Sequence, residues 1–320
     1  MNMQSEWASR ECPSCGSKVI SSKPVQISAI PAESLTWMEI KNLFVGLRAT
    51  QSFFSYQRCV DCHLAYNNYY FSQSQLDELY HLMPNNLMGE NVGTASKTQY
   101  RYADMILGET KTLKTYLELG PDIGLIGRRI SETFPESAAY LVEPNKGVHN
   151  DLSKNSQGFR NATVLVDLIE AENTLESNAD LIVGIHVLDH LLDPAHTLRK
   201  LHGLANKDAR LCIVVHNEKS LLRFVLNKKW PPFCLQHPVL YNKKTIQAIL
   251  KETGWEVTNI KNTVNHYSIR NLAKNFFAIM NFPSTLSKFL PQIEIPVTLG
   301  NILVTAQRRD AMESQNSLNQ

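Results

Sequence analysis

Short apolar runs alternate with helical patterns from residue 116 onward, and this alternation constrains the fold more than any other feature of the chain. Because strands joined through helices run parallel, the pattern predicts a parallel sheet covered by helices. Two later strands, at 256–260 and 301–306, flank an insertion at 262–300 that we interpret as a substrate lid. The five earlier runs are Tyr116-Leu-Glu-Leu119, Ala139-Tyr-Leu-Val142, Thr163-Val-Leu-Val166, Asp180-Leu-Ile-Val183 and Leu211-Cys-Ile-Val-Val215.

Four of the six cysteines form two Cys-x-x-Cys pairs, Cys12-Pro-Ser-Cys15 and Cys59-Val-Asp-Cys62. Zinc prefers four thiolate or imidazole ligands in a tetrahedron, and each such turn supplies two of them. The long separation between the pairs costs little, because loop-closure entropy grows only logarithmically. We therefore predict a closed, structural zinc site with Cys12, Cys15, Cys59 and Cys62 as ligands. A redox pair is the alternative, although redox motifs usually open a helix and occur singly.

A glycine-containing loop, Gly120-Pro-Asp-Ile-Gly124-Leu-Ile-Gly127, joins the first strand of the alternating region to a helix. Glycine allows a ligand to approach the backbone closely at such a turn. Glu143 ends the following strand, where an acid accepts hydrogen bonds from ribose hydroxyls. The three glycines do not have the G-x-G-x-x-G spacing of dinucleotide binding, so a nicotinamide oxidoreductase is the weaker interpretation.

These residues resemble the class I S-adenosylmethionine-dependent methyltransferases, whose first motif runs acidic-x-Gly-x-Gly-x-Gly and whose second strand ends in an acid. Glu118, Gly120, Gly124 and Glu143 match those positions, and Asp122 replaces the middle glycine. The resemblance covers residues of about 95 to 310. It implies S-adenosylmethionine as methyl donor and an α/β fold with a Rossmann-like, seven-stranded, mostly parallel sheet and a C-terminal antiparallel strand.

The same resemblance implies which residues bind the cofactor and which acceptors are methylated. The cofactor-binding residues it implies are Glu118, Gly120, Gly124, Glu143 and Asp167, the last lying after the third strand near the adenine. With the cysteine module in front, the chain is similar to bacterial methyltransferases that modify sugars or small metabolites. We expect O- or C-methylation of a sugar or secondary metabolite. A methyltransferase-fold binding protein without activity is the alternative.

Three ionisable residues, His186, Asp189 and His190, follow the fourth strand. They lie at the carboxyl edge, where ligands bind in such sheets. Histidine suits a general base because its pKa lies near neutral, so we predict His186 and His190 as catalytic residues. A structural role for both is the alternative. The ubiquinone-pathway O-methyltransferases have an acidic-x-x-acidic-His cluster at the corresponding place, and this resemblance implies a third alternative, metal-assisted methylation of a catechol.

The chain divides into four parts on this interpretation. We predict a zinc-ribbon module at 1–71, a helical connector at 72–110, the methyltransferase domain at 111–310 and a loose tail at 311–320. The formal charge is only +2, so nucleic acid is not an expected partner. Residues 1–11 are polar, so we do not expect export through a secretory signal. No apolar stretch approaches the ~20 residues that cross a bilayer. We expect a cytoplasmic protein that acts on a small molecule, with no membrane partner and an oligomeric state that the sequence leaves open.

Overall fold

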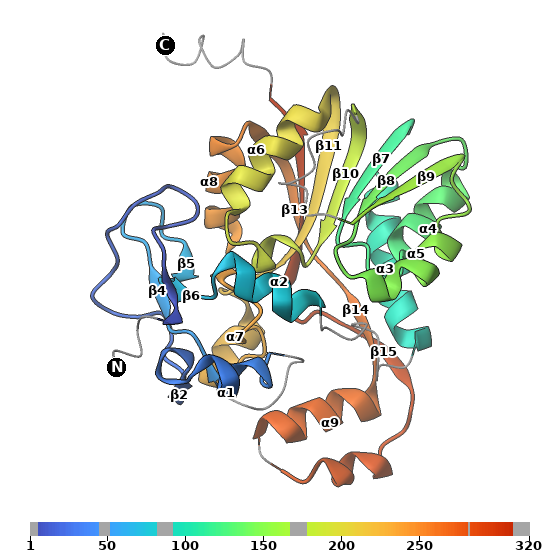
Figure 1. The fold of residues 1–320 in the computed structure, drawn as a ribbon. Helices are drawn as coiled ribbons and strands as arrows, with labels where there is room; N and C mark the ends of the chain where they lie inside the picture. The colour runs from blue at the N-terminus through green and yellow to red at the C-terminus, as the bar shows by residue number, and fades with distance from the viewer. Residues whose placement is uncertain (1–5, 45–51, 82–91, 167–177, 281, 310–320) are drawn as a thin grey trace.

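A seven-stranded sheet forms the centre of the computed structural model, which describes residues 6–44, 52–81, 92–166, 178–280 and 282–309 (Figure 1). The strand order is β13-β16-β11-β10-β7-β8-β9. Only β16 runs antiparallel to its neighbours in this sheet. The strands are β7 (Thr115–Leu119), β8 (Ala138–Val142), β9 (Asn161–Leu165), β10 (Ala179–Ile185), β11 (Ala205–His216), β13 (Trp255–Asn262) and β16 (Asn301–Arg308). The predicted fold class is confirmed.

The predicted strands differ from the observed ones mainly at their ends. Val166 lies one residue beyond β9, and β11 begins at Ala205, six residues before the apolar run that predicted it. The added residues Asn206, Lys207 and Asp208 are polar and partly or fully exposed, so hydrophobicity gives no sign that they belong to a strand. The predicted tail, 311–320, lies outside the described residues.

Helices cover both faces of the sheet (Figure 1). On one face lie α3 (Val92–Leu107), α4 (Leu125–Thr133) and α5 (His149–Asn155), and on the other α6 (Pro194–Leu204) and α8 (Lys243–Glu252). Successive β10 residues pack into different cores, with Leu181 and Val183 on the α4 side and Ile182 on the α6 side. Burial on both faces explains why this strand is a continuous apolar run.

The N-terminal part consists of short strands and turns that pack against late parts of the chain. Here β4 (Tyr56–Arg58) and β5 (Ala65–Asn67) pair, and β12 (Val239–Leu240) adds a third strand to their sheet. Cys12, Cys59 and Leu64 belong to the same apolar cluster as residues of the central sheet. The other elements are β1 (Ala8–Ser9), β2 (Ile30–Pro31), β3 (Ser52–Phe53), β6 (Tyr69–Tyr70), η2 (Ala32–Ser34) and α1 (Trp37–Lys41).

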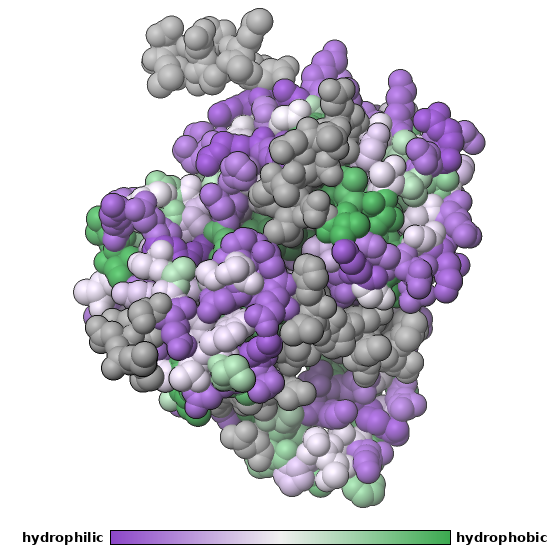
Figure 2. Space-filling view, in the orientation of Figure 1, coloured by the Kyte–Doolittle hydropathy of each residue, from purple (hydrophilic) through white to green (hydrophobic). Residues whose placement is uncertain are grey.

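The insertion between β13 and β16 forms an arm at the bottom of Figure 1. Its stem is the antiparallel pair β14 (Asn265–Ser268) and β15 (Glu294–Val297), and α9 (Ile269–Met280) packs on η6 (Ser284–Phe289). The remaining elements are α2 (Gln73–His81), η3 (Lys146–Val148), η4 (Leu188–His190), α7 (Leu221–Leu226) and η5 (Asn227–Lys229). Among the described helices, none is long and apolar enough to cross a bilayer. The face shown in Figure 2 is mostly hydrophilic, with apolar residues in separate areas.

Candidate functional site

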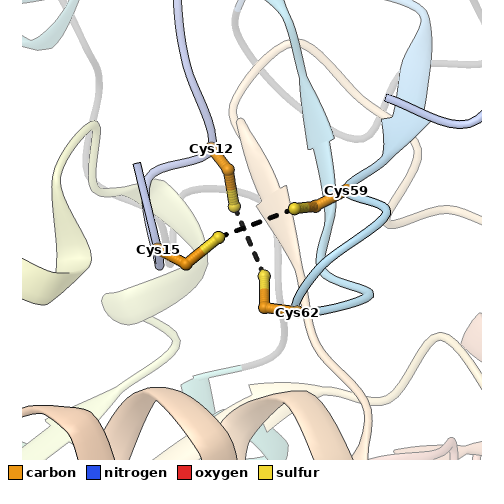
Figure 3. Close-up of side chains that lie close together, drawn as sticks. All are labelled: Cys12, Cys15, Cys59 and Cys62. Atoms are coloured by element: carbon orange, nitrogen blue, oxygen red, sulfur yellow. Dashed lines mark hydrogen bonds between the residues drawn. The ribbon is translucent and has the colours of Figure 1, made fainter. Parts of the chain in front are cut away.

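The four paired cysteines point toward one common centre (Figure 3). The Sγ atoms of Cys12 and Cys62 are 3.4 Å apart, and those of Cys15 and Cys59 are 3.6 Å apart. A tetrahedron with zinc–sulfur bonds of about 2.3 Å has edges of about 3.8 Å. The donor set and its spacing therefore fit one zinc ion with four thiolate ligands and no open position.

The two cysteine turns have the same backbone construction. In the first, the Cys12 amide donates to Ser17 O and the Gly16 amide donates to Cys12 O; in the second, the Cys59 amide donates to Leu64 O and the His63 amide donates to Cys59 O. Gly16 and His63 occupy the same place and have φ values of 71° and 61°. His63 thus fills a glycine-like position and is not a member of the thiol cluster.

The loop between β7 and α4 requires glycine at two positions. Gly120 and Gly124 have φ values of 59° and 81°. A Cβ atom on Gly120 would lie 2.7 Å from the Val187 side chain, and one on Gly124 would lie 2.7 Å from that of Leu152. Asp122, between them, also has a positive φ of 52°, which strains a residue that carries a Cβ atom.

Glu143 lies directly against this loop. Its Oε2 accepts a hydrogen bond from the Asp122 amide and its Oε1 accepts one from the Asn145 amide, each at 2.9 Å. Burial raises the pKa of Glu143. Burial and the neighbouring Glu143 carboxylate raise the pKa of Asp122 to about 6. Glu143, the acid expected to bind the ribose, therefore lies at the loop, where it accepts hydrogen bonds from two backbone amides.

Glu118 has a different position from the other predicted cofactor residues. Its side chain is buried against α4, where a Cβ atom on Gly127 would lie 3.3 Å from Glu118 Oε2. Burial raises the pKa of Glu118 to about 8, so its carboxyl group is largely protonated at neutral pH. Glu118 thus lies between the loop helix and the sheet. Asp167, the fifth predicted cofactor residue, lies outside the described residues.

Four histidines and one aspartate cluster at the carboxyl edge of β10 and β11. His186 follows β10, His190 and Asp189 lie in η4, and His216 is the last residue of β11. His237 completes the cluster: its ring centroid is 4.8 Å from that of His216 and 4.7 Å from that of His190. The rings of His186 and His216 are 4.5 Å apart. Both predicted catalytic residues, His186 and His190, thus belong to one cluster.

Asp189 fixes the orientation of one of these histidines. It is fully buried, and its Oδ2 accepts hydrogen bonds from His216 Nδ1 at 2.6 Å and from the His216 amide at 3.0 Å. By contrast, His190 Nδ1 lies 3.2 Å from the Tyr80 hydroxyl, and His186 Nε2 lies 3.4 Å from the Asn301 amide nitrogen. His216 is therefore the histidine of the cluster that is held by a carboxylate.

Burial keeps the imidazoles of the cluster neutral. It lowers the pKa of His186 to about 3 and also lowers the pKa values of His190, His216 and His237. Among the described residues, Asp189 Oδ1 and His186 Nδ1 have no hydrogen-bond partner although they are buried. One ligand-type atom each of His186, Asp189 and His216 lies within 4.8 Å of the others. The arrangement can accept a proton or hold a cation.

His216 and His237 have weaker sequence signals than His186 and His190. His216 directly follows the predicted strand that ends at Val215, and that position is its only signal. Its pairing with Asp189 depends on the parallel contact of β10 with β11, which places the two strand ends side by side.

Residues 95–260 match the model of a family described as a methyltransferase domain. A solved chain from the complex between the Haloferax volcanii Trm112 methyltransferase activator and a methyltransferase has a TM-score of 0.50 and 12% identity, over 67% of this chain and 91% of that one. The magnesium protoporphyrin IX methyltransferase of Synechocystis with bound SAH has a TM-score of 0.45 and 14% identity, over 74% and 88%. No curated protein sequence matches the chain.

Proposed function

Because the chain belongs to the methyltransferase domain family and is an S-adenosylmethionine-dependent methyltransferase, we propose that its acceptor is a small molecule, a sugar or secondary metabolite, methylated on oxygen or carbon. The observation that carries this proposal is the Asp189–His216 pair at the carboxyl edge of the sheet. A hydroxyl acceptor must lose its proton during methyl transfer, and a positioned neutral histidine can accept that proton. The pair therefore favours an oxygen acceptor.

We propose that the loop between β7 and α4 holds the cofactor, which supplies an activated methyl group when it is bound. Gly120 and Gly124 allow the backbone to approach it closely. The ribose hydroxyls replace backbone amides as hydrogen-bond donors to Glu143, and Glu118 supports the loop from the buried side. Asp167 stays in the proposal as the residue near the adenine, on the resemblance alone.

In this proposal His216 is the general base. Asp189 accepts the Nδ1 proton of His216, which leaves Nε2 with the lone pair that takes the acceptor proton. His186 and His190 stay in the proposal as the next candidates, since their rings contact those of His216 and His237. A base held by a buried carboxylate keeps one tautomer and one orientation, which serves proton transfer better than a mobile side chain does.

We further propose that the cysteine site binds zinc and that this zinc is structural. Support comes from the four-thiol geometry, and the closed donor set leaves no position for a substrate. Ligand Cys59 and neighbouring Leu64 pack with the central sheet, so the metal also stabilises the contact between the N-terminal part and the sheet.

Calorimetric titration of the full-length, zinc-loaded protein tests the cofactor site. We expect S-adenosylmethionine and S-adenosylhomocysteine to bind, NAD not to bind, and Glu143→Gln to weaken both complexes at least tenfold through lost ribose hydrogen bonds. Glu136→Gln, on an exposed residue, is the matched control. Failure of both sulfur compounds to bind would overturn the proposed site. Binding without methyl transfer to any small-molecule extract would identify an inactive binding protein.

One observation favours a second candidate, metal-assisted methyl transfer. The unpartnered Asp189 Oδ1 and His186 Nδ1 lie beside His216, and two histidines with one carboxylate form a common divalent-metal donor set. A cation there would lower the pKa of a bound hydroxyl. Equilibrium dialysis against Co²⁺ or Mn²⁺ separates the candidates. Binding of one metal ion per chain in addition to the cysteine-site zinc, and its loss in Asp189→Asn, would support metal-assisted transfer. Binding of the cysteine-site zinc alone would contradict it.

A further inference from the structure

A cleft of about 370 Å³ separates the N-terminal part from the segment that follows β11. Its walls come from residues 21 and 23–25, from Arg58 on β4, from residues 218–220 and from residues 223 and 224 of α7. This volume lies within the range of small-molecule sites. The cleft lies outside the cofactor loop, and neither the cysteine site nor the histidine cluster includes its lining residues.

The charges along the cleft do not balance. Glu218 is the one acid among the lining residues. It is buried and already occupied, since Arg58 donates to both its carboxylate oxygens at 3.0 and 2.8 Å and Asn242 donates to Oε1 at 2.8 Å. Lys23, Lys219 and Arg223 also line the cleft, and none of these three forms an ion pair within the described part of the chain. Four cationic side chains, including Arg58, thus face one concave space that holds a single acid, Glu218.

Arg223 is the best-positioned of these cations. Its guanidinium lies over the Phe233 ring, 4.7 Å from the ring centroid. Burial lowers the pKa of Arg223, the Glu218 carboxylate opposes this shift, and the nearby Arg58 adds to it. A half-buried guanidinium beside another cation gains stability when an anion binds. Arginine offers parallel N–H groups that match the oxygen spacing of phosphate. At the rim, the Phe224 side chain is 81% exposed, so an aromatic ring is free to stack on a planar group.

We propose that this cleft binds the phosphates of a small phosphate-bearing molecule, with a nucleoside diphosphate group as the best-fitting class. The cationic walls contact the phosphates, and Phe224 contacts the base. A concave site of this volume with few cations suits a small ligand better than a nucleic acid or a lipid surface, and the formal charge of +2 for the whole chain agrees with that.

Two aromatic side chains lie between Arg223 in the cleft and the histidine cluster. The Trp230 ring centroid lies 6.4 Å from that of His216 and 5.2 Å from that of Phe233. The Arg223 guanidinium lies over the Phe233 ring. His216 also precedes Glu218 by two residues. The cleft therefore lies close to the proposed base, with these buried rings between the two. The role of the cleft ligand as methyl acceptor rests on the proposed function, whereas phosphate binding itself does not.

Calorimetry on the full-length, zinc-loaded protein tests the cleft with inorganic pyrophosphate, uridine diphosphate and uridine as probes. We choose uracil as the base because an adenine nucleotide could also bind at the cofactor site. We expect pyrophosphate to bind once per chain, uridine diphosphate to bind more tightly and uridine not to bind. Arg223→Gln and Lys219→Gln should each weaken uridine diphosphate at least tenfold. Lys219 is exposed, so its replacement keeps the test valid even if Arg223→Gln disturbs folding.

Lys228→Gln, on an exposed residue of η5 outside the cleft, is the matched control and should bind like the wild type. Absence of pyrophosphate and uridine diphosphate binding, or binding that neither cleft variant weakens, would overturn the proposal. Cosedimentation with phosphatidylglycerol vesicles through Lys219 and Arg223, without uridine diphosphate binding, would overturn it in favour of a lipid surface. Titration with S-adenosylmethionine separates the two proposals, because Arg223→Gln should keep full cofactor affinity. Loss of phosphate binding at the cleft and loss of cofactor binding at the loop can therefore be observed independently.

Discussion

The cysteine site and the carboxyl edge of the central sheet both gather ionisable side chains, but with opposite consequences for stability. At the cysteine site, four thiols approach to the spacing of a zinc tetrahedron, so a bound metal offsets the cost of gathering them. At the sheet edge, burial shifts the pKa values of Glu118, Asp189 and the histidines toward their neutral forms. If the cysteine site binds zinc as proposed, the first region stabilises the fold. Burial of ionisable groups in the second region lowers stability, and the proposed reactive site is built from those groups.

Loss of one thiol should have the largest effect on stability. We expect Cys59→Ser to abolish stoichiometric zinc binding and to lower the free energy of unfolding by several kcal/mol, because zinc binding supplies folding free energy. Metal analysis and thermal unfolding measure both effects. Cys212→Ala, in the sheet core and away from the thiol cluster, should keep full zinc. A zinc-free Cys59→Ser protein with wild-type stability would show that the cysteine site does not stabilise the fold.

Loss of the proposed base should affect reaction and not folding. We expect His216→Gln to slow methyl transfer about 100-fold or more, with zinc content and cofactor affinity unchanged. Transfer of radiolabel from S-adenosylmethionine into a small-molecule extract measures the rate. His196→Gln, on an exposed residue at the start of α6, is the control. Unchanged transfer by His216→Gln would remove this residue from the mechanism.

Glu118 tests whether the sheet edge lowers stability. Its folded-state pKa of about 8 lies above the usual 4.5, so its stabilising contribution is complete below pH 4.5 and is lost as the pH rises toward 8. Glu118→Gln stays neutral throughout. The variant should therefore gain about 2–3 kcal/mol relative to the wild type between pH 5 and pH 7.5. Urea unfolding at both pH values measures the difference, and a pH-independent difference would refute the assignment.

Asp122 should oppose cofactor binding through the bulk and the charge of its side chain. Asp122→Gly removes a side chain from the loop that approaches the cofactor and a carboxyl group beside Glu143, so we expect about 1 kcal/mol of tighter S-adenosylmethionine binding, roughly fivefold. Asp122→Asn removes only the charge and should give a smaller gain. Weaker cofactor binding by both variants would show that Asp122 contributes a favourable contact.

The smallest effect is expected at the cysteine site, at the position where the second turn carries His63. We expect His63→Gly to stabilise the protein by about 0.5–1 kcal/mol, because glycine adopts a positive φ without steric cost. Zinc stoichiometry should not change. Loss of zinc from this variant in metal analysis would mean that His63 contributes to the metal site.

The sequence predicted what depends on local pattern. Periodic apolar runs located the strands, and Cys-x-x-Cys spacing located both halves of the thiol cluster before the structure brought them together. Positions set by strand order could not be predicted in the same way. Asp189 and His216 are 27 residues apart and meet through the β10–β11 contact. Arg58 and Glu218, which both line the cleft, are 160 residues apart. No local sequence pattern could therefore predict the cleft.

The sheet that joins β5 to β12 has a consequence for the order of synthesis. Val239 and Leu240 complete a sheet whose other strands end at Asn67, and roughly 170 residues (68–238) are translated in between. At ribosomal rates this takes on the order of 10 to 30 seconds. The N-terminal part therefore emerges long before its last strand exists, and early zinc capture by the cysteines would keep its partly exposed apolar residues ordered during that interval.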